Sequence, residues 1–330
     1  MPSRAQWDAA RARGRCQAAL RSHFAARGFL EVETPALVPL PGLEPHIDPF
    51  ETPFVPQTGV GTARPLYLHT SPEYAMKRLL ADGSGPIFQL ARVYRNGEVS
   101  AHHNPEFTML ELYRPHADYR AIMEDTERAL AAGAAAAAQA DTVFSRTPYE
   151  RITVQDAVLR ATGIDLRAIG EDEAGLAAAA SEAGVLVGAH DGYDDVFFHL
   201  FLQKVEGTLG RERPTFLCEY PASMASLARL KPADPTVAER VELYVGGVEL
   251  ANGFSELTDA TEQRRRFEAE QAQRRAANRP AYPIDERFLD AVERLPPCTG
   301  IAVGLDRVLM LAVGAATLAE VLLFPAQEFL

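Results

Sequence analysis

Two strand-like segments joined by a long polar connection constrain this fold more than any other feature of the sequence. Residues 86–95 and 106–114 both read as β-strands, in which successive side chains lie on opposite faces. In the second segment, EFTMLELYR, this alternation predicts a core face and an opposite face. The core face carries Thr108, Leu110 and Leu112, and the opposite face carries Phe107, Met109, Glu111 and Tyr113.

Glu111 therefore lies in the middle of a strand and is aimed away from the predicted core. One glutamate could simply be a solvent-exposed charge on the strand. The length of the connection between the two strands, however, indicates a functional role. A hairpin that only reverses the chain uses roughly two to five residues. Here the long polar segment 96–106 separates the strands, includes two adjacent histidines and follows Arg95. Such a loop predicts a binding site.

A second hairpin is predicted in VELYVGGVELANGFSEL, with Gly246 and Gly247 at the turn. In that register Tyr244 faces Glu249 and Glu242 faces Ala251. The two glutamates then share one face as diagonal neighbours, roughly 7–8 Å apart at the backbone. Two exposed acids would repel each other, whereas a shared divalent cation would hold them together. Magnesium, which binds few protein carboxylates and completes its shell with water and phosphate oxygens, fits such a pair.

Arg307 stands where the strand GIAVG turns into the helix DRVLML. A cation at a helix N-terminus opposes the helix dipole, so its position is poor for stability. A bound phosphate would offset both charges, which makes Arg307 a candidate phosphate ligand. Gly304, just before the helix, would let a planar ligand approach the backbone. The sequence contains no GxxxxGK[ST] motif, so the predicted phosphate site is not a P-loop.

The rest of the chain predicts an α+β fold, with an antiparallel β-sheet and helices to one side of it. Residues 3–27, 70–83, 118–140 and 259–278 read as helices, and 148–235 read as a helical insertion. The last long helix carries the basic run Arg264–Arg266, which we interpret as a solvated helix face, with phosphate contact as a minor alternative.

Composition narrows the class of protein. A chain of 330 residues with 47% hydrophobic residues can bury a large core, and no run of 18 apolar residues predicts a membrane span. The formal net charge of −12 argues against a dedicated nucleic-acid binder. Cys16, Cys218 and Cys298 are far apart and form no CxxC pair, so neither a zinc site nor a disulfide framework is expected, and a reducing cytoplasm fits best.

The motifs resemble those of the class II aminoacyl-tRNA synthetases, specifically the lysyl branch. FQLARVYRNGEVSAHHNPEFTMLELY resembles motif 2, GIAVGLDRVLML resembles motif 3, and RGFLEVETPAL resembles motif 1 with Pro35. TSPEY and VELYVGGVELANGFSEL resemble lysyl-type substrate and metal segments. The resemblance covers nearly the whole chain and implies one class II catalytic domain over 1–330. Motif 1 begins almost at the N-terminus, so no OB-fold anticodon-binding domain is expected before it.

The resemblance also implies roles for individual residues. Arg95 and Arg307 are expected to be the catalytic arginines, on the α- and γ-phosphates of ATP, and Phe107 is expected to stack on adenine. Glu242 and Glu249 are expected to bind magnesium. The remaining ATP contacts are expected from Asn96, Gly97, His103, Asn104, Glu249, Leu250 and Gly304.

The substrate pocket that the resemblance implies holds two ammonium groups. Glu73 and Glu111 are expected to bind one of them, and Glu256 with Tyr113 the other. Ser71, Pro72, Asn252, Phe254 and Ala302 are expected to line this pocket. Ala302 stands where the tRNA synthetases typically have glycine, which would trim the pocket for an altered lysine isomer. Gly97 stands where the family commonly has glutamate, although Glu98 is adjacent.

A lysyl-type chain without an anticodon-binding domain resembles the ligases that modify elongation factor P. That family implies activation of (R)-β-lysine or α-lysine with ATP and magnesium, and transfer to a lysine side chain of elongation factor P. It also implies a homodimer in the cytoplasm, with no membrane association and no tRNA acceptor. Two alternatives stay open: a truncated lysyl-tRNA synthetase-like enzyme that uses tRNA or a free amine as acceptor, and an inactive regulatory paralogue.

Overall fold

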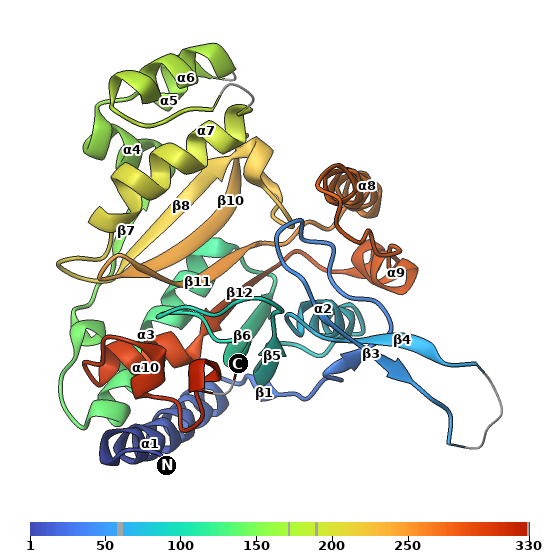
Figure 1. Cartoon of the computed structure of the whole chain (residues 1–330), viewed down its shortest axis with the longest axis vertical. Helices are drawn as coiled ribbons and strands as arrows, with labels where there is room; N and C mark the ends of the chain where they lie inside the picture. Colours follow the sequence, from blue (N-terminus) through green and yellow to red (C-terminus); the bar gives the residue numbers. More distant parts are fainter. Residues whose placement is uncertain (58–61, 171, 189–190, 329) are drawn as a thin grey trace.

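A large mixed β-sheet forms the centre of the molecule (Figure 1). The computed structural model describes residues 1–57, 62–170, 172–188, 191–328 and 330. The main sheet has the strand order β1-β5-β6-β12-β11-β10-β8-β7, with β9 paired to β10. Its strands are β1 (Leu30–Glu31), β5 (Ile87–Tyr94), β6 (Glu106–Pro115), β7 (Glu150–Thr153), β8 (Thr215–Pro221), β9 (Leu230–Lys231), β10 (Asp234–Val245), β11 (Val248–Ser255) and β12 (Cys298–Gly304).

The predicted α+β class is confirmed, but the sheet is not wholly antiparallel. The β5–β6 hairpin pairs Ile87 with Tyr113 and Tyr94 with Glu106, as the sequence predicted. At the two ends of the sheet, however, β1 pairs with β5 and β7 pairs with β8 in parallel. These edge strands reach their partners through long connections that contain helices rather than through tight turns, which allows the parallel direction.

Helices cover both faces of the sheet, so the prediction of helices on one side is wrong. Leu110 and Leu112 of β6 lie in a core with α1, α3 and α10, while Tyr113 lies with Met76 and Leu80 of α2 on the opposite face. The helices are α1 (Arg4–Ala26), α2 (Glu73–Ala81), α3 (Tyr119–Ala138), α4 (Val154–Thr162), α5 (Leu166–Ile169), α6 (Glu173–Glu182), α7 (Tyr193–Leu200), α8 (Ala260–Ala276), α9 (Glu286–Arg294) and α10 (Leu305–Ala312).

Because both faces of the sheet are covered, side chains on both faces of β6 lie in the interior. Glu111 does point away from the core of Leu110 and Leu112, yet it is only 1% exposed, because α2 covers its face. The carboxylate in the middle of the strand is therefore an interior charge rather than a surface one.

A β-bulge alters the predicted register of the Gly246-Gly247 hairpin. Both glycines have positive φ, as a two-residue hairpin turn requires, and Tyr244 faces Glu249 as predicted. Beyond that pair the register shifts, so that Glu242 faces Asn252 rather than Ala251. Leu250 is the extra residue in β11. A bulge of this kind bends the strand and redirects its side chains.

Helices α4–α7 lie together at one end of the sheet, beside β7, β8 and β10 (Figure 1). They belong to the segment 148–235, of which residues 171, 189 and 190 lie outside the described residues. The same segment contributes β7, β8 and β9 to the main sheet. A smaller sheet of β2 (Leu37–Val38), β4 (Arg64–Leu68) and β3 (Phe50–Phe54), in that order, lies at the opposite side of the molecule (Figure 1).

The basic run on α8 is only partly a solvated face. Arg265 is exposed, but Arg266 donates to the backbone carbonyls of Ser226 and Ala228. Arg274 is fully buried and pairs with Asp48. These arginines tie α8 to neighbouring loops, which the helical pattern alone did not predict. No helix among the described residues is long and apolar enough to cross a membrane, and the three cysteines are free and buried.

Candidate active site

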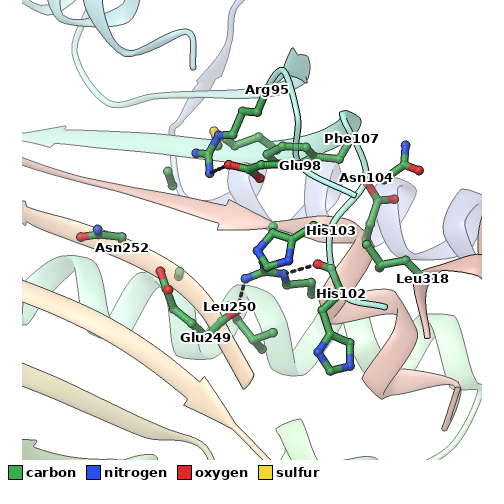
Figure 2. Close-up of a pocket in the computed structure, with 16 residues that line it drawn as sticks. Arg95, Glu98, His102, His103, Asn104, Phe107, Glu249, Leu250, Asn252 and Leu318 are labelled. Atoms are coloured by element: carbon green, nitrogen blue, oxygen red, sulfur yellow. Dashed lines mark hydrogen bonds and ion pairs between the residues drawn. The ribbon is translucent and has the colours of Figure 1, made fainter. Parts of the chain in front are cut away.

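A pocket of about 580 Å³, including its open mouth, lies where the β5–β6 loop meets β11, β12 and the start of α10 (Figure 2). It brings together most of the residues predicted to bind ATP. The predicted residues that line it are Arg95, His103, Asn104, Phe107, Glu249, Leu250, Asn252, Ala302, Gly304 and Arg307. Asn96 and Gly97 form the exposed turn after Arg95 and are not among its lining residues, whereas Glu98 is.

Arg307 is held by three hydrogen bonds in the third position of α10. It donates to the carbonyls of His102 (2.9 Å) and Glu249 (2.7 Å), and its Nη2 lies 2.7 Å from Nε2 of His103. Burial lowers the pKa of its guanidinium, yet arginine stays protonated in proteins. The strand-to-helix turn therefore presents a fixed positive charge to the pocket, at the position that the sequence predicted.

Arg95 lines the same pocket and lies over the ring of Phe107 (Figure 2). Its Cζ is 5.2 Å from the ring centroid, and Nη1 is 3.7 Å from a carboxylate oxygen of Glu98. Among the described residues its buried Nε has no hydrogen-bond partner. An unpaired buried donor is costly, so a phosphate oxygen at this position would complete the site. The family resemblance predicts that Phe107 stacks on adenine, and here the guanidinium of Arg95 covers one part of its ring.

His103 contacts Arg307, whereas Asn104 makes hydrogen bonds to the backbone of two segments. Burial, and then the charge of Arg307, lower the pKa of His103, so its neutral ring can accept at Nε2 from Arg307. The amide of Asn104 donates to the carbonyl of Glu106 and accepts from the N–H of Ala326. Its side chain therefore joins the loop to the C-terminal segment, a supporting contact that sequence reasoning did not predict.

Glu249 and Glu242 lie close enough to interact electrostatically. Burial, and then the negative charge of Glu242, raise the pKa of Glu249 to about 7. Among the described residues the Glu249 carboxylate makes no hydrogen bond or ion pair, whereas Glu242 accepts from the hydroxyls of Tyr220 and Tyr244 and pairs with Arg240. No group of three or more His, Cys, Asp or Glu side chains in the described part of the chain could hold a metal. A cation here would bind mainly to Glu249 and to oxygens of a ligand.

Gly304 leaves open space in the pocket. A Cβ atom at this position would meet its nearest protein neighbour, the carbonyl oxygen of Leu250, at 3.7 Å, which is an ordinary contact. Protein packing therefore does not require glycine here, and a flat ligand lying against the backbone is a reason for it. Asn252 lies across the pocket, where its Oδ1 has no hydrogen-bond partner among the described residues.

The predicted ammonium ligands lie deeper, between β6 and α2. Glu111 accepts from the hydroxyl of Tyr113 at 2.6 Å and from Ser71 at 2.8 Å. Ser71 in turn accepts from the backbone N–H of Glu73, the first residue of α2. Pro72 precedes that helix as its N-cap. The substrate residues predicted from the TSPEY segment and from β6 thus form one hydrogen-bonded group.

Lys77 joins the other two predicted glutamates, and sequence reasoning missed it. Its Nζ lies 2.5 Å from Glu73 and 2.6 Å from Glu256. The ammonium also lies over the rings of Phe254 and Phe288, at 5.4 and 5.9 Å from their centroids. The spacing of four residues between Glu73 and Lys77 was the available signal, because it puts both side chains on one face of a helix.

Further carboxylates surround this group. Glu44 lines a second cavity together with Ser71 and Glu73, and Glu270 of α8 lies close enough to Glu44 and Glu73 to feel their charges. Burial raises the pKa of Glu111, Glu256 and Glu270 to about 8 in each case. No local pattern in the sequence singled out Glu44 or Glu270. The interior of the site is therefore strongly acidic and suited to a ligand with positive charges.

The raised pKa of Glu111 predicts that stability falls as the pH rises from about 5, where the unfolded carboxyl ionises, to about 8, where the folded one does. The folded state keeps a proton that the unfolded chain has already lost, so the free energy of unfolding should fall as the pH rises from about 7 to about 8.5. For Glu111 alone the fall is about 1 kcal/mol. Urea denaturation at both pH values should show a smaller decrease for Glu111→Gln than for the wild type. An identical decrease in both proteins would contradict the assignment.

Comparison with known proteins agrees with this geometry. The sequence profile of the tRNA synthetases class II (D, K and N) matches residues 4–328. The elongation factor P–(R)-β-lysine ligase of Salmonella typhi is 45% identical over 313 residues, which cover 94% of this chain and 93% of that protein. The ligase of the same name from Salmonella paratyphi A is 45% identical over 306 residues, 92% of this chain and 91% of that protein. The chain therefore belongs to the class II tRNA synthetase family, together with these elongation factor P–(R)-β-lysine ligases.

Proposed function

We propose that this protein is a ligase that activates (R)-β-lysine or α-lysine with ATP and transfers it to a lysine side chain of elongation factor P. One observation carries the proposal: the buried carboxylates of Glu111 and Glu256, with the half-buried carboxylate of Glu73, adjoin a pocket that holds Arg95 and Arg307. Carboxylates suit the two ammonium groups of a lysine, and arginines suit the phosphates of ATP. The names of the relatives point to the same substrates.

The first step is formation of an aminoacyl-adenylate. The substrate carboxylate is ionised at neutral pH, so it attacks the α-phosphorus without a general base, and pyrophosphate leaves. Arg95 and Arg307 offset the negative charge that develops on the phosphate oxygens. The hydrogen bonds of Arg307 to two carbonyls hold its guanidinium in place before ATP binds. In the second step an amine of the acceptor attacks the adenylate carbonyl and releases AMP.

ATP and a divalent metal are general requirements of the class II synthetase family. For this chain we propose magnesium, with Glu249 as the principal protein ligand and Glu242 beside it. The carboxylate of Glu249 has no partner among the described residues, which suits a metal ligand, while Glu242 is already oriented by two tyrosines and Arg240. When bound, the metal would supply positive charge to the phosphate oxygens of ATP.

Glu249→Gln should abolish magnesium-dependent adenylation. The amide removes one negative charge from the proposed ligand while it preserves the size of the side chain. We expect pyrophosphate exchange to fall by about 100-fold or more, the loss typical when a group that stabilises charge in the transition state is removed. Glu182→Gln, at an exposed position in α6, is the control. Unchanged exchange in Glu249→Gln would remove the metal assignment.

Two other functions make different predictions. A synthetase-like enzyme that uses tRNA or a free amine as acceptor would have the same activation site, so only the acceptor distinguishes it. The net charge of −12 disfavours tRNA. An inactive regulatory paralogue would bind nucleotide without releasing pyrophosphate. The inactive paralogue is disfavoured because one region of this protein retains Arg95, Glu242, Glu249 and Arg307.

The test of function is the intact mass of elongation factor P after incubation with the protein, magnesium and ATP. One tube contains (R)-β-lysine and a second contains α-lysine. We expect the factor to gain one lysyl unit, and the faster tube identifies the preferred isomer. Pyrophosphate exchange without any mass gain would leave the activation step intact but reject elongation factor P as the acceptor.

We also propose that the protein is a cytoplasmic homodimer. Motif 1, which includes Pro35, forms a two-fold interface in the family that the chain resembles, and the three free cysteines suit a reducing compartment. Light scattering at micromolar concentration should give twice the chain mass of 36.0 kDa. A monomeric mass under those conditions would reject the dimer.

A further inference from the structure

Lys77 is an interior cation within the acidic group. Its side chain is 3% exposed, and its ammonium bridges Glu73 and Glu256, which come from two different elements. Glu73 begins α2, and Glu256 directly follows β11. The Phe254 and Phe288 rings cover the ammonium. A bare charge would be costly in this environment, and the two carboxylates compensate for it.

Counting charges suggests what this cation does. Glu73, Glu111 and Glu256 carry three negative charges when all are ionised, and Lys77 reduces the total to two. A diamino acid brings two ammonium groups, which would face the two charges that Lys77 leaves uncompensated among these three carboxylates. Without Lys77 a third carboxylate would stay uncompensated in the interior, and it would take up a proton rather than stay charged.

The contacts of Lys77 leave one carboxylate oxygen of Glu256 without a partner among the described residues. Lys77 contacts one oxygen of each carboxylate, Oε1 of Glu73 and Oε2 of Glu256. The buried Oε1 of Glu256 makes no hydrogen bond among the described residues. The ammonium thus fixes the direction of both carboxylates while it leaves a free acceptor. Its charge lowers the pKa of Glu256, against the larger effect of burial.

We propose that Lys77 is a positioning residue, which holds Glu73 and Glu256 charged and oriented to bind the two ammonium groups of the diamino acid. The proposal rests on the proposed function and concerns the same site. The paired carboxylates raise the pKa of Lys77 above its ordinary value. Its amine therefore stays protonated and has no lone pair with which to attack the adenylate. The lysine closest to this substrate site is thus kept from accepting the acyl group.

The alternative is a purely structural ion pair that holds α2 against the end of β11. Substrate kinetics separate the two roles, because a structural defect would disturb ATP and amino acid binding alike. The variants are Lys77→Met, which removes the charge, and Lys77→Arg, which keeps it. Lys231→Met is the control, since Lys231 also pairs with a glutamate, Glu219, but outside this site.

The assay is pyrophosphate exchange with (R)-β-lysine or α-lysine. For Lys77→Met we expect the KM for the diamino acid to rise about tenfold or more, the scale of a lost charge interaction, with the KM for ATP within about twofold. Lys77→Arg should restore the KM for the diamino acid to within about threefold of wild type. An unchanged KM in Lys77→Met, or parallel rises for both substrates, would overturn the proposal. An equal defect in Lys77→Arg would also overturn it.

A second measurement does not depend on whether Lys77→Met folds. The sequence has three lysines, Lys77, Lys204 and Lys231. Nuclear magnetic resonance of protein labelled with ¹⁵N at the lysine side chains can therefore resolve each ammonium, and Lys77→Arg assigns the Lys77 signal by its loss. Saturating diamino acid should shift that signal and leave the Lys231 signal in place. An unmoved Lys77 signal would overturn the proposal.

The outcomes separate this proposal from the proposed function. A wild-type protein that exchanges pyrophosphate with neither diamino acid would reject the function, and the role of Lys77 with it. A wild-type protein that is active with a diamino acid, together with a Lys77→Met variant of unchanged KM, would reject only the role of Lys77.

Discussion

Buried negative charge is the constraint on which the rest of this structure depends. Glu111 in β6 and Glu256 after β11 are buried, Glu73 of α2 is half-buried, and burial raises the pKa of Glu111 and Glu256 to about 8. An isolated buried carboxylate is costly, so each needs a donor. Ser71 and Tyr113 supply donors to Glu111, and Lys77 supplies its ammonium to the other two. What remains is a group in which carboxylates outnumber the one ammonium of Lys77, which favours a cationic substrate.

The neighbouring pocket contains two arginine side chains, Arg95 and Arg307. Arg307 is fixed by carbonyls of the β5–β6 loop and of β11, and Arg95 lies over Phe107. These cations are oriented before any ligand arrives, so little ordering is needed when phosphates bind. β6 connects the two pockets, because Phe107 and Met109 lie toward the arginines and Glu111 and Tyr113 lie among the acids. One strand thus aligns the proposed phosphate site with the proposed ammonium site, the arrangement that adenylation of a diamino acid would use.

Local sequence patterns predicted the elements and failed where distant parts of the chain meet. The alternation in 106–114 correctly put Glu111 opposite Leu110 and Leu112, yet it could not reveal that α2 covers the second face. The glycine turn correctly paired Tyr244 with Glu249, but the bulge at Leu250 moved Glu242 opposite Asn252. Strand alternation carries no information about bulges, because one extra residue changes every later pairing. Likewise, Arg274 sits on a helix of polar composition but is buried by a loop more than 200 residues away in sequence.

The sequence by itself determined the two hairpins β5–β6 and β10–β11, the helices α1, α2, α3 and α8, the arginine at the start of α10, and the family to which its motifs point. These are local properties, since backbone period, turn glycines and motif spacing are all set by near neighbours. Only the tertiary structure decided that Lys77 pairs with Glu256, and that Glu44 and Glu270 join the acidic group. Those relationships depend on which elements pack together and on how far burial removes each charge from water. No single stretch of sequence encodes which distant elements pack together or how deeply a charge is buried.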